Sequence, residues 1–375
     1  MAVAAAAAVG ASADSLFVVQ QALAESTRRN YAAPLRAYTN FCAQRGLDPA
    51  PRAITVHGAG DWLSELALGG RVSSGTLKVY RSALSTAWEE AGVQGPNPLQ
   101  DAWIGRMMAG SQRMLRARDV SARAERERTI ELTPQLLGQL HASVSEHLRQ
   151  GLRVGNPAPI VCWTAACLGV FGLLRPSEFL ADGYQRFESP LRACDVTFYA
   201  LPDHPGEMGL HALDSAAQNI PDRFSIRLGP TKADQLARNA PLTIAAPMAV
   251  AAMWSWMSLR ARWGFEASGP LFNLEKRMVL SRPQLYKQLT EWLTPTLGYV
   301  PKLTGRCFRR GGASHLVESG ASAAAIMAAG RWKSKAMINV YASAAAKQAR
   351  ATLDSRAMEP PAAAAAGSAA GAGQR

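Results

Sequence analysis

The stretch TGRCFRRGGASHL, residues 304–316, carries the most informative arrangement of charge in the chain. Three arginines, Arg306, Arg309 and Arg310, stand before a Gly-Gly pair that we expect to open a helix. Cations beside the unpaired N–H groups of a helix N-terminus form an arrangement that binds anions. The alternative is a helix N-terminus with no ligand. The stretch predicts an anion site if other segments supply matching groups.

The whole chain is basic. It has 375 residues, and its 41 Lys+Arg against 28 Asp+Glu give a net charge of +13. This surplus favours a polyanionic partner, with nucleic acid first, although a merely soluble basic protein is the alternative. Apolar residues make up 48% of the chain, so we expect it to be mostly globular, with room for two domains.

Cysteine and histidine spacing argues against a metal. The five cysteines form no Cys-x-x-Cys pair, and the six histidines show no metal-binding spacing. We therefore expect reduced thiols in an intracellular protein without metal or other cofactor. It would lie in the nucleus of a eukaryotic host, and otherwise in the cytoplasm or nucleoid. No window holds about 18 strongly apolar residues, so we expect no membrane span.

Helical apolar spacing predicts a four-helix unit over residues 15–115. In its first helix we expect a cap at Ser26 or Thr27, with Pro34 near the first turn. We expect the other three helices within residues 54–70, 73–92 and 97–115.

Residues 116–130 lack apolar periodicity, and we interpret them as a basic linker between domains. In a clamp around DNA this linker would cross phosphates, whereas the alternative is a solvated run of charge. Residues 1–14 and 357–375 are biased towards Ala, Gly and Pro, which predicts a disordered arm and tail. The linker's candidates for DNA contact are Arg116, Arg118, Arg123, Arg126 and Arg128.

A second domain is predicted over residues 131–356. Thr133 and Pro134 have the pattern of a helix start, and a long apolar helix follows over 157–174. From residue 247 the pattern is helical to about residue 353. The predicted fold class is mainly α with a small β-sheet (α+β). Its strands are expected within 194–200, 224–229 and 240–246, the last two joined as a hairpin.

Three further segments of this domain carry groups that suit phosphate chemistry. GLLRPSEF supplies Arg175 and Glu178, GPTKADQ supplies Lys232, and GRWKSKAMINVYA has Trp332 nine residues before Tyr341. Phosphodiester transfer without a metal needs cations on the non-bridging oxygens, a nucleophile, and an acid for the leaving oxygen. Arg, Tyr and Lys can supply these groups. Taken singly, each residue has a structural alternative as a packing aromatic or a solvated charge.

The order and spacing of these motifs resemble the tyrosine recombinase (phage integrase-like) family over about residues 20–350. The resemblance implies an N-terminal helical core-binding domain followed by a tyrosine-recombinase catalytic domain. The FRRGG form also resembles the recombinases of eukaryotic mobile elements. The implied roles are Arg175 and Arg309 as catalytic arginines, Glu178 supporting Arg175, Lys232 as general acid, Trp332 at the family's His/Trp site, and Tyr341 as nucleophile.

One matched position departs from the family's pattern, because Arg306 stands where the family has histidine. Arginine can contact phosphate, so we keep Arg306 among the site residues, with Arg310 beside it as a candidate for DNA contact. Arginine cannot act as a general base near neutral pH. Removal of the Tyr341 proton would then rely on stabilisation of the phenolate by the arginines, or on water.

The resemblance implies a site-specific recombinase or integrase that cuts and rejoins double-stranded DNA through a 3′-phosphotyrosyl intermediate. It implies a homotetramer on two DNA sites, without metal, ATP or membrane, and residues 343–353 are our candidate for docking on a neighbouring protomer. Two alternatives stay open: a type IB topoisomerase-like enzyme, and a catalytically silent DNA-binding protein derived from a recombinase. Arg306 keeps the silent alternative open.

Overall fold

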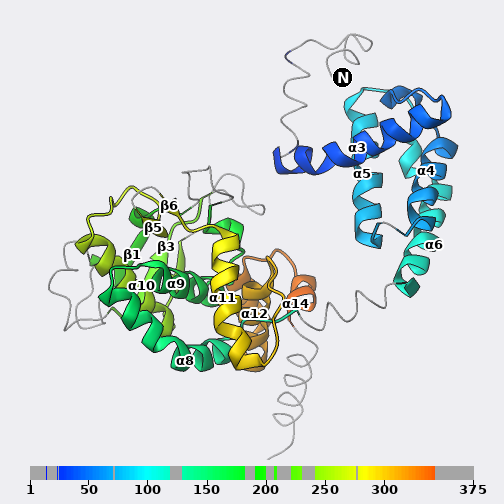
Figure 1. Cartoon of the computed structure of the whole chain (residues 1–375). Helices are drawn as coiled ribbons and strands as arrows, with labels where there is room; N and C mark the ends of the chain where they lie inside the picture. Colours follow the sequence, from blue (N-terminus) through cyan, green and yellow to red (C-terminus); the bar gives the residue numbers. More distant parts are fainter. Residues whose placement is uncertain are drawn as a thin grey trace, which may run out of the picture. The chain divides into compact units, whose positions relative to one another are not determined.

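The protein divides into two compact units, Met1–Arg126 and Glu127–Arg375. The computed structural model describes residues 25–70, 72–118, 129–181, 191–199, 207–208, 221–229, 241–275 and 278–342, together with Asp14 and Leu23. Figure 1 colours the helices of the first unit blue to cyan and those of the second green to orange.

The first unit contains the four predicted helices. Thr55 and Ser73 cap the second and third of them by accepting the N–H groups of Gly58 and Thr76. Their apolar faces meet in one core, where Tyr38 packs edge-on against Trp62 with ring centroids 5.2 Å apart. The helices are α3 (Glu25–Arg45), α4 (Val56–Leu68), α5 (Ser74–Glu90) and α6 (Ala102–Arg118).

The start of α3 differs from the expectation. The helix already includes Glu25, so the predicted cap at Ser26 or Thr27 is wrong, and Pro34 lies in the middle of the helix. A mid-helix proline removes one backbone hydrogen bond and crowds the preceding turn. The buried side chains Tyr38 and Phe41 on the following turns hold the helix against the core. Tertiary packing therefore overrides the local preference here.

Helix α6 reaches Arg118, so its last residues fall within the range predicted as a linker. Arg116 and Arg118 thus belong to the final turn of a helix. Three other predicted DNA contacts, Arg123, Arg126 and Arg128, lie outside the described residues, as does the arm at 1–14 apart from Asp14. The predicted domain boundaries stay a prediction.

The second unit is built around α9 (Ala158–Phe171). Every residue from Ile160 to Val170 is buried, because α8, α10, α11 and α12 surround the helix (Figure 1). As predicted, Thr133 caps α8 by accepting the N–H of Leu136 at 3.2 Å. Within the described ranges no helix is both long and apolar enough to cross a membrane. The other helices are α8 (Pro134–Arg153), α10 (Pro247–Arg262), α11 (Arg282–Leu297), α12 (Cys307–Glu318), α13 (Ala323–Gly330) and α14 (Ala336–Tyr341).

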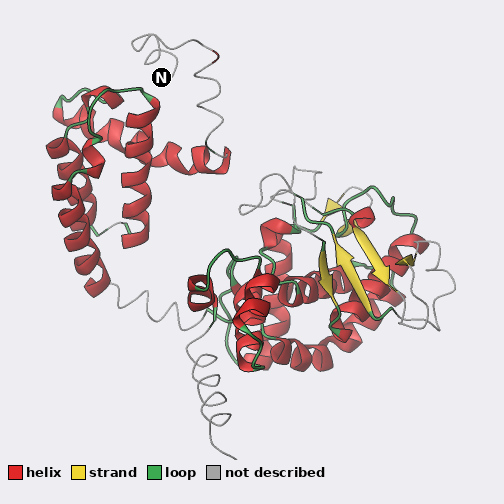
Figure 2. Ribbon diagram, turned by 180° about the vertical axis from the view of Figure 1, so that it is seen from behind, coloured by secondary structure: helices red, strands yellow, loops and turns green. Residues whose placement is uncertain are grey.

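An antiparallel sheet in the order β2-β1-β3-β4 lies beside these helices (Figure 2). The three predicted strands are present, and Phe224 of β3 faces Ile244 of β4, which gives the expected antiparallel pairing. Lys232, in the connection between them, lies outside the described residues. The strands are β1 (Val196–Tyr199), β2 (Glu207–Met208), β3 (Arg223–Ile226) and β4 (Leu242–Ile244).

A second, two-stranded sheet was not expected. Strands β5 (Asn273–Glu275) and β6 (Met278–Val279) form a hairpin where the sequence predicted continuous helix from residue 247. Strands of two or three residues show almost no alternation of apolar and polar positions, so their pattern cannot be separated from that of a helix end.

The Gly-Gly pair of FRRGG has a packing role. Helix α12 begins at Cys307, so Gly311 and Gly312 lie inside the helix, and the expectation that they open it is wrong. A Cβ on Gly311 would lie 1.9 Å from the carbonyl oxygen of Leu132, and one on Gly312 would lie 2.3 Å from that of Val170. The glycines therefore let α12 approach two backbone segments closely, and this approach fixes the position of the neighbouring Arg309.

The close approach predicts the effect of adding one methyl group. We expect Gly311→Ala to lower the free energy of unfolding of the second unit by about 1–3 kcal/mol or more, because Leu132 meets the new methyl with rigid backbone. Urea unfolding followed by circular dichroism measures the loss. Gly138→Ala in α8 is the control, since its Cβ would meet only Met248 at 4.0 Å, and we expect it to stabilise by about 0.5–1 kcal/mol. Equal stability of Gly311→Ala and the native protein would contradict the packing role.

Candidate active site

Arg175 is fixed by the turn that follows α9. Leu173 has a left-handed backbone, with φ of 49°, which redirects the chain after the helix. The backbone N–H of Arg175 then donates to Glu178 Oε2 at 2.7 Å, and its guanidinium Nη1 donates to Glu178 Oε1 at 3.2 Å. Glu178 therefore holds both the backbone and the side chain of Arg175, and its role as the supporting acid of a catalytic arginine stays a prediction.

The Glu178 carboxylate also binds two other arginines. Arg309 Nη1 lies 3.5 Å from Oε1, and Arg331 Nη2 lies 3.6 Å from Oε2. The carboxylate is almost fully buried, with 8% of its side chain exposed. Three guanidinium groups share this one carboxylate, so two positive charges within the group of four stay uncompensated. An anion would balance them.

Arg309 occupies the deepest position of the cluster. Burial lowers the pKa of its guanidinium to about 10, while the charge of Glu178 acts in the opposite direction. The group is still charged at neutral pH. One of its N–H groups donates to the carbonyl oxygen of Gly330, which ties α12 to the end of α13. A buried, fixed cation of this kind is suited to a substrate oxygen whose charge increases during reaction.

Tyr341 lies against this cluster, although it is 166 positions from Arg175 in sequence. Arg175 Nη2 donates to Tyr341 Oη at 2.9 Å. The Tyr341 ring stacks on Trp332 with centroids 5.1 Å apart and planes 10° from parallel. Arg309 Cζ lies 5.7 Å from the Trp332 ring centroid and 5.4 Å from that of Tyr341, within cation–π range of both. The phenol oxygen is thus placed directly at a guanidinium.

Two buried donors in the cluster have no hydrogen-bond acceptor among the described residues. They are the indole Nε1 of Trp332 and the Nε of Arg309. A buried donor left unpaired costs roughly 1–3 kcal/mol. An acceptor brought to either group would offset that cost.

A cavity of about 520 Å³ lies beside the cluster, and Arg175 is the cluster residue that lines it. Arg175, Arg306, Arg310 and Arg282 line it, and Arg306 is exposed at its edge. Arg310 also pairs with Glu131 at 2.6 Å, so its charge is partly balanced. The cavity therefore presents mostly positive charge to a ligand that approaches Arg175.

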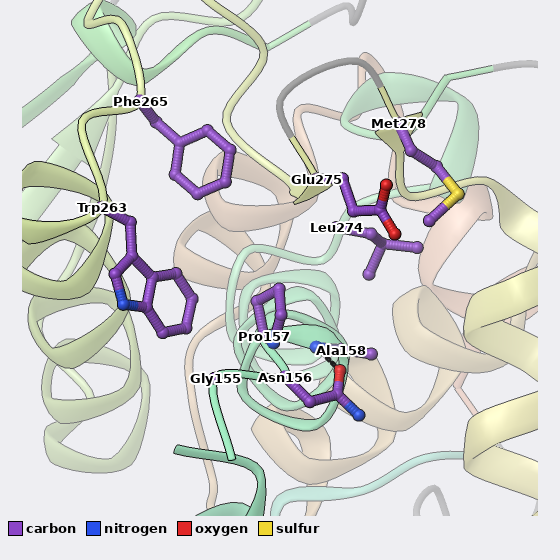
Figure 3. A pocket seen from close by; sticks show the side chains of 9 residues that line it. All are labelled: Gly155, Asn156, Pro157, Ala158, Trp263, Phe265, Leu274, Glu275 and Met278. Atoms are coloured by element: carbon purple, nitrogen blue, oxygen red, sulfur yellow. Dashed lines mark hydrogen bonds between the residues drawn. The ribbon is translucent and has the colours of Figure 1, made fainter. Parts of the chain in front are cut away.

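A second cavity, of about 590 Å³, has a different character (Figure 3). Trp263, Phe265 and Leu274 give it apolar walls, and Glu275 is the one charged residue among the described residues that line it. Asn156 Oδ1 accepts the N–H of Ala158, the first residue of α9, at 3.0 Å. None of its described lining residues also lines the arginine cavity, and we assign it no role in chemistry.

The structure brings together most of the predicted site. Arg175, Glu178, Arg309, Trp332 and Tyr341 form one connected cluster, and the cavity beside it includes Arg306 and Arg310. Among the residues that the structure describes, no group of three His, Cys, Asp or Glu side chains could hold a metal ion.

Two arginines of the site were missed by the sequence analysis. Arg331 has the pattern of a solvated turn residue, and Arg282 that of an exposed first residue of a helix. Neither belongs to a motif with a recognisable spacing. Only their positions in the fold, against Glu178 and beside Arg175 respectively, show that they belong here.

Comparison with solved structures identifies the fold. The XerH site-specific recombinase, in a post-cleavage complex with palindromic difH substrate, aligns with a TM-score of 0.56 and 15% identity over 88% of this chain and 80% of that chain. The Tn1549 transposon integrase in complex with transposon right end DNA aligns with a TM-score of 0.53 and 15% identity over 89% of this chain and 95% of that chain. This chain has the tyrosine recombinase fold. No protein-family model and no curated protein matches its sequence.

The predicted fold class, mainly α with a small β-sheet, is confirmed, since the structure is mainly helical with small antiparallel sheets. The likeness to recombinases of eukaryotic mobile elements stays a prediction. Within this fold, the cluster around Glu178 is assembled from three separate segments: the turn after α9, helix α12, and the segment from α13 to α14.

The shared carboxylate predicts a large effect of removing its charge. We expect Glu178→Gln to lower the free energy of unfolding by about 3–5 kcal/mol, because three guanidinium groups lose their common counter-charge. Asp195→Asn is the matched control, since Asp195 pairs with Arg192 in the same i,i+3 arrangement but with a largely exposed arginine. The control should cost less than about 1 kcal/mol in urea unfolding. Similar losses in both variants would show that the cluster does not depend on Glu178.

Proposed function

We propose that this protein is a site-specific DNA recombinase or integrase that cuts and rejoins DNA strands through a covalent 3′-phosphotyrosyl intermediate. The observation that carries the proposal is the hydrogen bond from Arg175 to Tyr341 Oη, 2.9 Å long, inside a cluster with surplus positive charge. A nucleophile, cations for a phosphate and a fixed acid that orients them would meet at one point.

In the proposed reaction, Tyr341 Oη attacks the phosphorus of a DNA phosphodiester and loses its proton. The bond from phosphorus to the 5′-oxygen breaks, and the 3′-phosphate stays on the tyrosine. Lys232 gives the 5′-oxygen a proton, so that a 5′-hydroxyl leaves. Attack by the 5′-hydroxyl of a partner strand reverses the steps and restores the tyrosine.

The two catalytic arginines would hold the non-bridging oxygens, where charge accumulates in the transition state. Arg175 is part-buried and reaches both the cavity and Tyr341, whereas Arg309 lies behind it and is buried. The Trp332 N–H has no acceptor in the described part of the chain, and we propose that it donates to a phosphate oxygen as a third contact. Each of these donors is held in place before substrate arrives, which lowers the cost of ordering.

Arg306 replaces a histidine base, and we propose a phosphate-binding role for it. Its exposed position on the cavity beside Arg175 is compatible with a contact to the DNA backbone. The Tyr341 proton would pass to water, while the hydrogen bond from Arg175 stabilises the phenolate that forms.

The proposed partner is double-stranded DNA, bound by a homotetramer across two sites. Support comes from the net charge of +13 and from the fold shared with XerH and the Tn1549 integrase, which were solved with DNA. The N-terminal helical unit and the linker arginines would add phosphate contacts and make binding sensitive to salt. Residues 343–353, proposed to dock on a neighbouring protomer, lie outside the described residues.

Loss of the Tyr341 hydroxyl should abolish adduct formation. DNA duplexes selected by the protein from a random library can be nicked near the bound site, so that cleavage traps the covalent complex. We expect a detergent-resistant protein–DNA adduct with the native protein and none with Tyr341→Phe, with DNA binding retained. Tyr286→Phe is the matched control, because Tyr286 is a partly buried tyrosine in the same unit whose hydroxyl has no partner among the described residues.

The same experiment separates the alternative functions. No adduct on DNA that the native protein binds would overturn the enzyme proposal and favour a silent DNA-binding protein. An adduct that persists in Tyr341→Phe would overturn only the choice of nucleophile. Relaxation of supercoiled plasmid without any joining of strands from two DNA sites would favour the topoisomerase-like alternative.

A substrate with a better leaving group tests Lys232 as general acid. We expect Lys232→Ala to slow cleavage by about 10²–10⁴-fold on ordinary DNA. Replacing the bridging 5′-oxygen by sulfur should restore most of the rate, because a thiolate leaves without needing a proton (thiol pKa near 8.5). Lys287→Ala, at an exposed position on α11, is the control and should show no sulfur-dependent gain. A Lys232→Ala defect of the same size on both substrates would exclude the acid role.

A further inference from the structure

We infer that Arg331 is a positioning residue that holds the Arg175 turn against the segment carrying Trp332 and Tyr341. This inference rests on the proposed function for its kinetic consequence, and on the contacts of Arg331 for its structural part. Arg331 would touch no substrate. It would act by fixing where Arg175 stands relative to the nucleophile.

The side chain of Arg331 bridges two chain segments. Its Nη1 donates to the carbonyl oxygen of Gly172 at 3.2 Å, and its Nη2 donates to that of Leu173 at 3.4 Å. These carbonyls belong to the turn that ends α9 and leads into Arg175. The same Nη2 lies 3.6 Å from Glu178 Oε2, so one guanidinium contacts the turn both before and after Arg175.

The backbone around Arg331 reaches the other half of the site. Gly330, the residue before it, gives its carbonyl oxygen to Arg309, and Trp332, the residue after it, stacks on Tyr341. Any displacement of Arg331 would therefore move Gly330, which accepts from Arg309, together with Trp332, which stacks on the proposed nucleophile Tyr341.

Two strained backbone positions meet at this contact. Leu173 and Arg331, with φ of 49° and 53°, are the two non-glycine residues of the described chain that have positive φ. The guanidinium of one donates to the carbonyl of the other. Left-handed backbone at a non-glycine residue persists where the surroundings hold it, and such positions gather at functional sites. Glycine would adopt the left-handed backbone at position 331 with less strain. The presence of arginine there therefore indicates a role for its side chain.

Arginine suits this position better than lysine. Its planar fork can satisfy two carbonyl oxygens and a carboxylate at once, whereas the single ammonium of lysine is a point charge with no fixed plane. Burial lowers the pKa of Arg331, with Glu178 opposing and Arg175 reinforcing the effect. The contacts named above therefore have to hold a charge that is largely removed from water.

Arg331→Gly provides the test, because it removes the fork while favouring the left-handed backbone. Arg331→Lys is the conservative variant. Arg192→Gly is the control, since Arg192 is a partly exposed arginine that pairs with Asp195 across a capping turn of the same kind as the Arg175–Glu178 turn, outside the cluster. Two measurements are made on the full chain: hydrogen exchange of the free protein, and single-turnover adduct formation at saturating nicked DNA.

We expect faster exchange in Arg331→Gly at residues 172–179, with α9 unchanged. We expect adduct formation to slow on the order of 100-fold while the dissociation constant for DNA stays the same, since a shift of about 1 Å in a positioned group costs roughly that much. Arg331→Lys should recover part of the rate, and Arg192→Gly should match the native protein. A merely structural role would instead raise exchange throughout the unit.

Two results would overturn the inference. One is an Arg331→Gly adduct rate equal to that of the native protein. The other is exchange at residues 172–179 that is unchanged, or that rises equally across the unit. If the native protein forms no adduct on DNA that it binds, the proposed function fails instead, and the exchange measurement alone decides whether Arg331 holds the turn.

Discussion

The buried carboxylate of Glu178 is the interaction on which the site depends. It receives the side chain and backbone N–H of Arg175 and the guanidinium groups of Arg309 and Arg331. One carboxylate among three cations, of which Arg309 is buried and Arg175 and Arg331 are partly buried, gives a cluster that is held together and still positive. That combination is suited to a phosphate, because the protein binds the arginines tightly enough to orient them and leaves enough charge to attract an anion.

Close packing makes this arrangement specific. The buried helix α9 ends at the turn that carries Arg175, and α12 can approach it only because Gly312 has no side chain. Gly330 plays a similar part, since a Cβ there would lie 2.6 Å from the Trp332 ring. Glycines in the motifs therefore determine distances between segments. The side chains of the cluster are positioned by backbone contacts that are as restrictive as the hydrogen bonds.

The sequence predicted those features that depend on a regular spacing of residues. Helical periodicity located the main helices of both units, and the ordered motifs located five side chains of the cluster, including Arg175 and Tyr341, from segments far apart. It missed features without a period. Strands β5 and β6 are too short to alternate, Pro34 is held in mid-helix by the core, and Arg331 gains its role from a turn 158 residues away.

The arginines of the site divide into two groups with different electrostatics. Arg309 is buried, Arg331 is mostly buried, and both contact Glu178, so salt screens their interactions little. Arg306 and Arg282 are exposed on the cavity, where salt at 0.1 M screens charges beyond about 10 Å. In the proposed reaction, the exposed group would draw in the DNA backbone, and the buried group would act on the scissile phosphate. Arginine at position 306, in place of the family's histidine, would then strengthen the attraction of DNA to the surface. Arg175, which lines the cavity and contacts Glu178, would stabilise the Tyr341 phenolate.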